Sequence, residues 1–113
     1  MNIDQIRAAF ARRVTDQVTL ADGTQVRLRH EFVTTHVDVH RPGQEPTYQG
    51  VVHPWVLGKG WPAQFATGKA GGRTHLLRHE THYPTKEEAI AALVEHQSQR
   101  RPDEPWDDTP TDA

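Results

Sequence analysis

The 113-residue sequence contains no cysteine, a single methionine and no long apolar run. Without thiols, the chain forms no disulfide, no thiolate metal site and no cysteine nucleophile. A membrane-spanning helix needs roughly 18 consecutive apolar residues, and no such run is present. The first residues also lack the apolar region of a signal peptide. Apolar residues make up 35% of the chain, which is below the usual globular share. We therefore expect one small cytoplasmic domain, with part of the chain outside its core.

Motifs of catalysis are also missing. The sequence has no nucleophile elbow, no P-loop and no dinucleotide-binding fingerprint. Its carboxylates cluster only at the start of the last predicted helix and in the C-terminal tail, where helix capping and disorder account for them. We therefore expect a protein that is not an enzyme and that uses no cofactor.

Charge is distributed unevenly along the chain. Residues 1–101 contain thirteen Lys or Arg and ten Asp or Glu, whereas residues 102–113 contain five acids and no base. The body is therefore mildly basic and the tail acidic, although the net charge is only -2. Arginine outnumbers lysine ten to three, a composition expected of a GC-rich genome, which hints at an actinobacterial or associated phage origin.

The clearest secondary-structure signal is a helix over residues 83–96. Thr85 is a natural N-cap, and Glu88, three residues later, completes a capping box. Behind the cap, apolar residues such as Ile90 and Leu93 recur at helical spacing. An amphipathic helix needs a surface to cover, so we expect it to pack on the strands that precede it.

A β-hairpin is predicted over residues 18–32. Apolar and polar residues alternate on both sides of Asp22-Gly23, a favoured two-residue turn. Arg27 and Arg29 would then share the face of the second strand that lies opposite its apolar face.

Further elements follow from similar patterns. Strands are predicted at 34–40, 48–57, 61–67 and 73–83, and a short helix at 2–14. The fold class is therefore α+β: a small antiparallel sheet packed against the C-terminal helix, with a short N-terminal helix and a hairpin. We expect a single domain over 1–98 and a disordered acidic tail over 99–113. The sequence leaves open whether residues 15–40 extend the same sheet.

Four short motifs between residues 48 and 94 form a recognisable series. They are Tyr48-Gln49-Gly50-Val51, His53-Pro54-Trp55, Gly58-Lys59-Gly60-Trp61-Pro62-Ala63-Gln64-Phe65 and Tyr83-Pro84-Thr85-Lys86-Glu87-Glu88-Ala89. The series resembles the plant ethylene-response-factor DNA-binding domain and is similar in layout to the arm-binding domains of phage integrases. The resemblance implies a three-stranded antiparallel sheet backed by a helix, with the sheet in the DNA major groove. Family arginines that contact DNA correspond here to Gln49, Val52 and His53, so the resemblance bears on architecture more than on activity.

A candidate nucleic-acid interface combines cations with tryptophans. Its residues are Arg27, Arg29, Trp55, Lys59, Trp61, Lys69, Arg73 and Arg78. Cations bind phosphate, and exposed aromatic rings stack on bases or wedge open a groove. The alternative is that the tryptophans belong to the core and the cations to a solvated surface. Our leading prediction is a small accessory or regulatory protein that binds duplex DNA or another nucleic acid through its exposed sheet face.

The competing hypothesis is a protein-interaction module, such as a phage-borne or actinobacterial modulator of a host protein. It would use Trp55, Trp61 or Trp106, the last of which lies within the acidic tail. Three interpretations of that tail stay open: a solvating segment, a docking peptide for a partner, or a nucleic-acid mimic that folds back on the basic face.

Eight histidines are present, and His75, His79 and His82 are closely spaced. On a helix, His75 and His79 would share a face and could hold a metal ion. The surrounding sequence favours a strand, in which they would lie about 13 Å apart at roughly 3.3 Å per residue. That distance is too long for one ion, so we predict surface histidines and no metal site.

Overall fold

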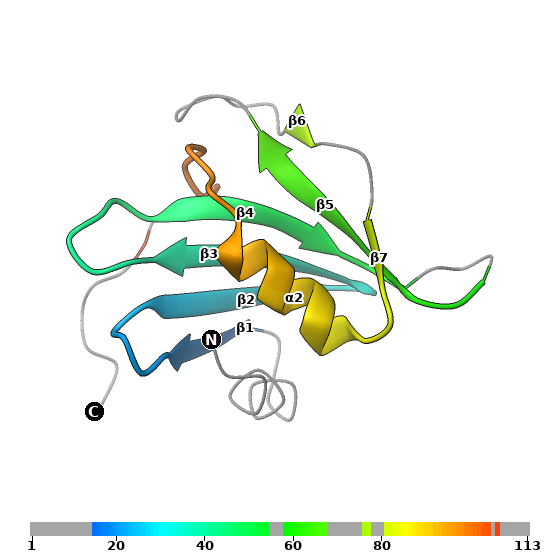
Figure 1. The fold of residues 1–113 in the computed structure, drawn as a ribbon. Coiled ribbons are helices and arrows are strands. Elements are labelled where there is room, and N and C mark those ends of the chain that lie inside the picture. Colours follow the sequence, from blue (N-terminus) through cyan, green and yellow to red (C-terminus); the bar gives the residue numbers. More distant parts are fainter. Residues whose placement is uncertain (1–14, 55–57, 68–75, 78–80, 105, 107–113) are drawn as a thin grey trace.

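The computed structural model describes residues 15–54, 58–67, 76–77, 81–104 and 106 of the chain. They form an antiparallel sheet with one helix packed across it (Figure 1). The elements are β1 (Thr15–Thr19), β2 (Gln25–Glu31), β3 (Thr34–His40), β4 (Thr47–Val52), β5 (Trp61–Thr67), β6 (Leu76–Leu77), β7 (Thr81–Tyr83) and α2 (Lys86–Glu95). The predicted α+β architecture, a sheet covered by the C-terminal helix, is confirmed. The predicted N-terminal helix at 2–14 lies outside the described residues.

The strands from β1 to β5 pair antiparallel in the order in which they occur along the chain. Strand β5 then pairs with β7 near its start and with β6 near its end. Because β3 pairs with both β2 and β4, residues 15–40 belong to the same sheet as the rest. The two strands predicted at 34–40 and 61–67 have the bounds of β3 and β5.

The strand predicted at 48–57 is longer than the observed one. Strand β4 ends at Val52, shortly before Pro54, because proline has no amide hydrogen to donate to a neighbouring strand. Within 73–83, the described residues form two short strands, β6 and β7.

The turn between β1 and β2 is one residue longer than the Asp22-Gly23 pattern predicts. The amide of Leu20 donates to the carbonyl of Thr24, and the amide of Gly23 donates to the carbonyl of Leu20. Three residues, Ala21–Gly23, therefore connect the strands. Gly23 has φ +90°, the left-handed conformation that closes a three-residue hairpin loop.

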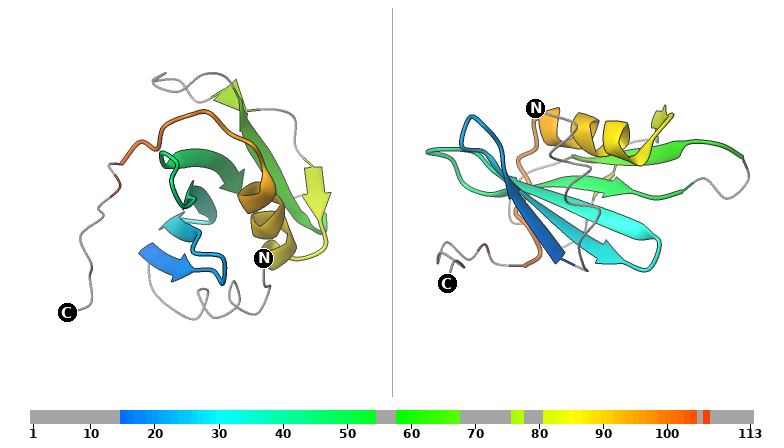
Figure 2. Two further views of the ribbon diagram at one scale, coloured as in Figure 1. Left: turned by 60° about the vertical axis from the view of Figure 1, so that its left-hand side comes forward. Right: turned by 90° about the horizontal axis from the view of Figure 1, so that it is seen from below.

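The hydrophobic core lies between the sheet and α2 (Figure 2). Its buried residues are Leu20, Val26, Leu28, Val37, Val39, Val52, Ala63, Ala89, Ile90, Leu93 and Val94. The helix begins as predicted, because the Thr85 hydroxyl accepts a hydrogen bond of 3.2 Å from the amide of Glu88. Alternation along β2 and β3 then places Arg27, Arg29 and Asp38 on the face opposite the helix.

A β-bulge in β4 attaches the C-terminal end of α2 to the sheet. The register between β3 and β4 shifts between Val37 and Asp38, and Gln49 is the extra residue on β4. The buried Gln49 amide donates to the carbonyl of Leu93 at 2.7 Å and also to that of His96. The bulge thus adds hydrogen-bond donors from the sheet to carbonyls at the end of the helix.

Gly50, beside the bulge, lets β4 approach both β5 and α2 closely. Its φ is +141°, and a Cβ atom built there would lie 2.1 Å from the Gln64 carbonyl oxygen and 2.8 Å from Cδ2 of Leu93. A side chain at this position therefore meets backbone, which cannot move aside as a flexible side chain can.

We expect Gly50→Ala to lower the free energy of unfolding by about 3 kcal/mol, because overpacking and backbone strain each cost roughly 1–3 kcal/mol. Gly43→Ala is the matched control, since Gly43 also has a left-handed φ of +72° but no atom within 4 Å of its Cβ position. Its expected loss is about 1 kcal/mol, from backbone strain alone. Urea denaturation followed by circular dichroism measures both. Equal losses would contradict the close approach at Gly50.

Candidate functional site

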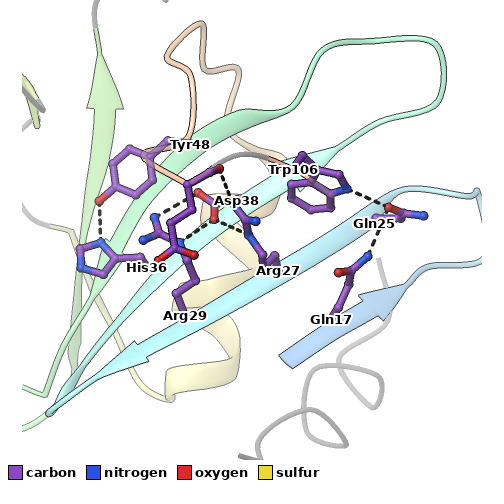
Figure 3. Close-up of polar contacts among 9 residues, drawn as sticks. Gln17, Gln25, Arg27, Arg29, His36, Asp38, Tyr48 and Trp106 are labelled. Carbon is purple, nitrogen blue, oxygen red and sulfur yellow. Dashed lines mark hydrogen bonds and ion pairs between the residues drawn. The ribbon is translucent and has the colours of Figure 1, made fainter. Parts of the chain in front are cut away.

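The sheet face opposite α2 carries a buried ion cluster (Figure 3). Asp38 is fully buried, and its Oδ2 accepts from Nε of Arg27 at 3.0 Å and from Nε of Arg29 at 2.7 Å. The side chains of Arg27 and Arg29 are only 9% and 12% exposed. Burial alone would lower the pKa of Arg29, but its hydrogen bond to Asp38 and the charges of Asp38, Glu104 and Asp103 raise it overall. Both guanidinium groups are therefore held by a single carboxylate.

Tyr48 extends this cluster along β4. The guanidinium of Arg29 lies 5.9 Å from the centre of the Tyr48 ring, and the Tyr48 hydroxyl hydrogen-bonds with Nδ1 of His36 at 2.9 Å. Nε2 of His36 lies 3.4 Å from a carboxylate oxygen of Glu31. Burial raises the pKa of the Tyr48 phenol well above its ordinary value, so it acts as a neutral hydrogen-bonding group.

The chain after α2 passes from the helix side of the sheet to this opposite face (Figure 2). The Ser98 hydroxyl donates to the Tyr48 carbonyl at 2.5 Å, and the Tyr48 amide donates to the Arg100 carbonyl at 2.8 Å. Arg100 is 3% exposed, and its Nη1 donates to the Thr67 carbonyl at 3.1 Å. Residues 98–100 thus run beside the start of β4, where β5 does not pair with it.

Further along the chain, Glu104 and Trp106 contact Arg27. The Glu104 carbonyl accepts from Nη2 of Arg27 at 2.9 Å, and the Arg27 guanidinium lies 4.7 Å from the centre of the Trp106 ring. The Trp106 indole donates to Oε1 of Gln25 at 3.2 Å, and the His40 ring meets it edge-on with centres 5.4 Å apart. A cation over an aromatic face is attractive, more so when partly desolvated.

The acidic tail that the sequence predicts to be disordered begins at residue 99. At 99–104 and 106 the structure places the chain along the sheet, and residues 105 and 107–113 lie outside the described part. The partners of Arg100 and Trp106 are distant in the sequence.

The predicted interface residues are distributed over several parts of the structure. Arg27 and Arg29 share the polar face, as the alternation predicted, but both pair with Asp38. Lys59 is exposed in the connection from β4 to β5. Trp61 is half-buried against the core, with Nζ of Lys86 5.7 Å from its ring centre, which matches the core alternative for this tryptophan. The predicted site residues that lie outside the described part are Trp55, Lys69, Arg73 and Arg78.

Sequence reasoning missed Gln25, Asp38, His40 and Tyr48 as members of this site. A signal for two of them was present, because alternation over Thr34–His40 places Asp38 and His40 on one face of a strand. Pairing that strand with the hairpin aligns this face with Arg27, and only the register shows that Asp38 lies directly opposite.

We expect Asp38→Asn to lower the free energy of unfolding by about 3–5 kcal/mol, because it removes the buried carboxylate that accepts from both guanidinium groups. Glu45→Gln, at an exposed position, is the control and should change stability by less than about 0.5 kcal/mol. Urea denaturation at neutral pH measures both. A loss for Asp38→Asn no larger than that of the control would show that the cluster is not a structural centre.

His30 lies on the α2 side of the sheet. Its Nε2 is 3.3 Å from Oδ2 of the buried Asp16, and its Nδ1 hydrogen-bonds with the Thr35 hydroxyl at 3.0 Å. Burial lowers the pKa of His30 below its ordinary 6.5, the charge of Lys86 lowers it further, and Asp16 acts in the opposite direction. The folded protein therefore disfavours the charged imidazole.

The depressed pKa of His30 predicts that stability falls on acidification. The contribution of the neutral imidazole is complete above pH 6.5 and is lost as the pH drops through the folded-state pKa, because the unfolded chain then binds the proton more readily. We expect His30→Gln to lose less stability between neutral and mildly acidic pH than the wild type. His82→Gln, at an exposed position, is the control. Urea midpoints across this range test the prediction, and an unchanged pH slope in His30→Gln would refute it.

Among the described residues, no three histidine, cysteine or carboxylate side chains are grouped to hold a metal ion. His82 is exposed, whereas His75 and His79 lie outside that part of the chain. None of the helices described is long and apolar enough to cross a membrane.

Comparisons of the chain with protein-family models, with curated proteins and with solved structures give no match. The function is therefore argued from the geometry.

Proposed function

We propose that this protein is a non-enzymatic protein-interaction module that inserts the tip of its β2–β3 hairpin into an apolar pocket of a partner protein. The tip consists of Phe32 and Val33, which connect the paired residues Glu31 and Thr34. Phe32 has a relative exposure of 102% and Val33 of 63%, and they are the exposed large hydrophobic residues of the described chain.

The main support for this proposal is the backbone conformation of Phe32. Its φ is +55°, and Phe32 is the one non-glycine residue with a positive φ among those described. Two-residue hairpin turns favour glycine or asparagine at such positions, and a bulky residue there costs roughly 1–2 kcal/mol. Single exposed apolar residues are ordinary, but a fully exposed phenyl ring on an unfavourable backbone stabilises nothing in the fold. Binding to a partner accounts for both features.

The described residues support a nucleic-acid partner less well. Arg27 and Arg29 share one buried carboxylate, and Trp61 packs towards the helix. The exposed Glu31 adjoins Phe32 and would repel phosphate groups near the tip. An apolar pocket on a protein suits this tip better than a nucleic-acid backbone.

One arrangement within the described residues resembles a catalytic series, and its burial supports the non-enzymatic part of the proposal. The His30 ring lies between Asp16 and Thr35, 3.3 Å from the carboxylate of Asp16 and 3.0 Å from the hydroxyl of Thr35. Thr35 is fully buried, so no substrate can approach its hydroxyl.

The test is site-specific photo-crosslinking in the cells that make the protein. A photoreactive phenylalanine at position 32 should give one discrete product, whereas the same group at the exposed Gln44 should give none. With the partner purified, Phe32→Ser should weaken binding about 10-fold or more, because burying a phenyl side chain contributes roughly 1.5–3 kcal/mol. Products of equal yield from both positions would contradict the proposal.

The second part of this test measures how the affinity depends on salt and whether the protein binds DNA. Affinity at an apolar interface should barely change between about 50 and 200 mM salt, whereas DNA binding falls steeply over that range. A mobility shift with duplex DNA at low salt, reduced by Lys59→Ala, would restore the nucleic-acid proposal.

The strain at Phe32 also predicts a gain of stability on its removal. Phe32→Gly should raise the free energy of unfolding by about 1 kcal/mol, because glycine adopts a left-handed φ without steric cost. Val33→Gly is the matched control at the neighbouring position and should lower it by about 0.5–1 kcal/mol through added backbone entropy. Thermal or urea denaturation measures both. A loss of stability in Phe32→Gly would show that the phenyl ring serves the fold and would remove the argument for a partner.

A further inference from the structure

The C-terminal segment contacts the sheet at two places, which differ in how deeply the segment is buried. The first set, at residues 98–100, includes a backbone hydrogen bond to Tyr48 and the side chain of Arg100, which is 3% exposed. This part is built into the sheet. The second set, at residues 104 and 106, contacts the surface formed by Gln25, Arg27 and His40, which we name the peptide site. Figure 3 shows Gln25 and Arg27 of this site beside Trp106.

The peptide site offers complementary groups for one kind of side chain. Oε1 of Gln25 accepts from the Trp106 indole at 3.2 Å and also from Nε2 of Gln17 at 3.3 Å, which orients the Gln25 amide. Arg27 lies over the indole ring and His40 meets its edge. Asp38 holds the Arg27 guanidinium in place for this contact. A hydrogen-bond acceptor, a cation and an aromatic edge together recognise tryptophan.

The peptide site also favours a ligand that carries negative charge. Arg27 and Arg29 carry two positive charges against the single buried carboxylate of Asp38. The exposed Asp103 and Glu104 lie close enough to raise the pKa of Arg29, which shows that acidic residues beside the tryptophan interact favourably with this face. Arg27 binds the backbone carbonyl of Glu104, a group that any polypeptide supplies.

We propose that the peptide site binds a tryptophan-containing acidic segment of a partner protein, and that Glu104 and Trp106 occupy it in cis until such a segment displaces them. The chain's own segment identifies the ligand chemistry, because it is seated there through contacts that another polypeptide of the same character can reproduce. The site does not depend on the hairpin tip, which lies at the opposite end of β2 from Gln25.

The experiment measures binding of a fluorescein-labelled peptide with the sequence of residues 101–110 to the full-length chain by fluorescence polarisation. The Trp106→Ala chain should bind the peptide about 10-fold more tightly than the wild type, because the competing tryptophan is gone. A peptide with alanine in place of its tryptophan should lose this binding.

Two variants in the Trp106→Ala background locate the site. Gln25→Ala should weaken peptide binding about 5-fold, since it removes the acceptor of the indole N–H, whereas Gln97→Ala, at an exposed position, should leave it unchanged. Equal affinity of the wild type and Trp106→Ala chains, or binding unaffected by Gln25→Ala, would overturn the proposal.

A second measurement follows peptide binding to the wild-type chain. The Trp106 indole N–H signal in a ¹⁵N-correlation spectrum, assigned with Trp106→Phe, should move towards its solvent-exposed position as unlabelled peptide is added. A signal that stays in place at millimolar peptide would overturn the proposal. Sedimentation of the wild-type chain alone tests whether a second copy of this chain occupies the peptide site. A concentration-dependent dimer that Trp106→Ala abolishes would show this and would overturn the proposal of a foreign partner.

Discussion

The arrangement of Arg27 and Arg29 around Asp38 constrains the polar half of this structure. Three charged groups are removed from water, and the free energy of doing so is recovered only if each donor meets an acceptor. Asp38 lies opposite Arg27 in the register of β2 and β3. A slip of one residue would turn Asp38 towards the apolar core and bring Val37 or Val39 to the polar face. The cluster therefore fixes the register, and with it the surface that receives the C-terminal segment.

The two faces of the sheet are linked through β4. On the helix side, the bulge at Gln49 supplies donors to the end of α2, and Gly50 allows the close approach of β5. On leaving the helix, the chain bonds to both backbone groups of Tyr48 and buries Arg100 before it reaches the polar face. The same strand thus anchors the helix and directs the segment that follows it, so a change at the bulge affects both faces.

The two proposed binding surfaces differ in how they are maintained. The hairpin tip keeps an exposed phenyl ring on an unfavourable backbone, which is a property of two neighbouring residues. The peptide site is occupied by Glu104 and Trp106 of the same chain. The hairpin tip would always be exposed to a partner, whereas the peptide site would be exposed only when a partner segment displaces Glu104 and Trp106. Such a module can bind two partners. The hairpin tip contains none of the cations that suggested nucleic-acid binding, whereas the peptide site uses one of them, Arg27, which Asp38 holds in place.

The sequence by itself determined the local elements. The Thr85 cap, the alternation over Thr34–His40 and the bounds of Trp61–Thr67 follow from residues that are near neighbours in the chain, where sterics and short-range hydrogen bonds act. Tertiary structure alone decided that β3 joins the hairpin to the rest of the sheet, that Trp61 faces the helix, and that the acidic segment lies on Arg27. The last contact joins residues 77 positions apart, and no periodicity or turn signal spans such a distance. Those features depend on which surfaces the fold brings together, because the free energy of a buried charge or an indole is set by its neighbours in space.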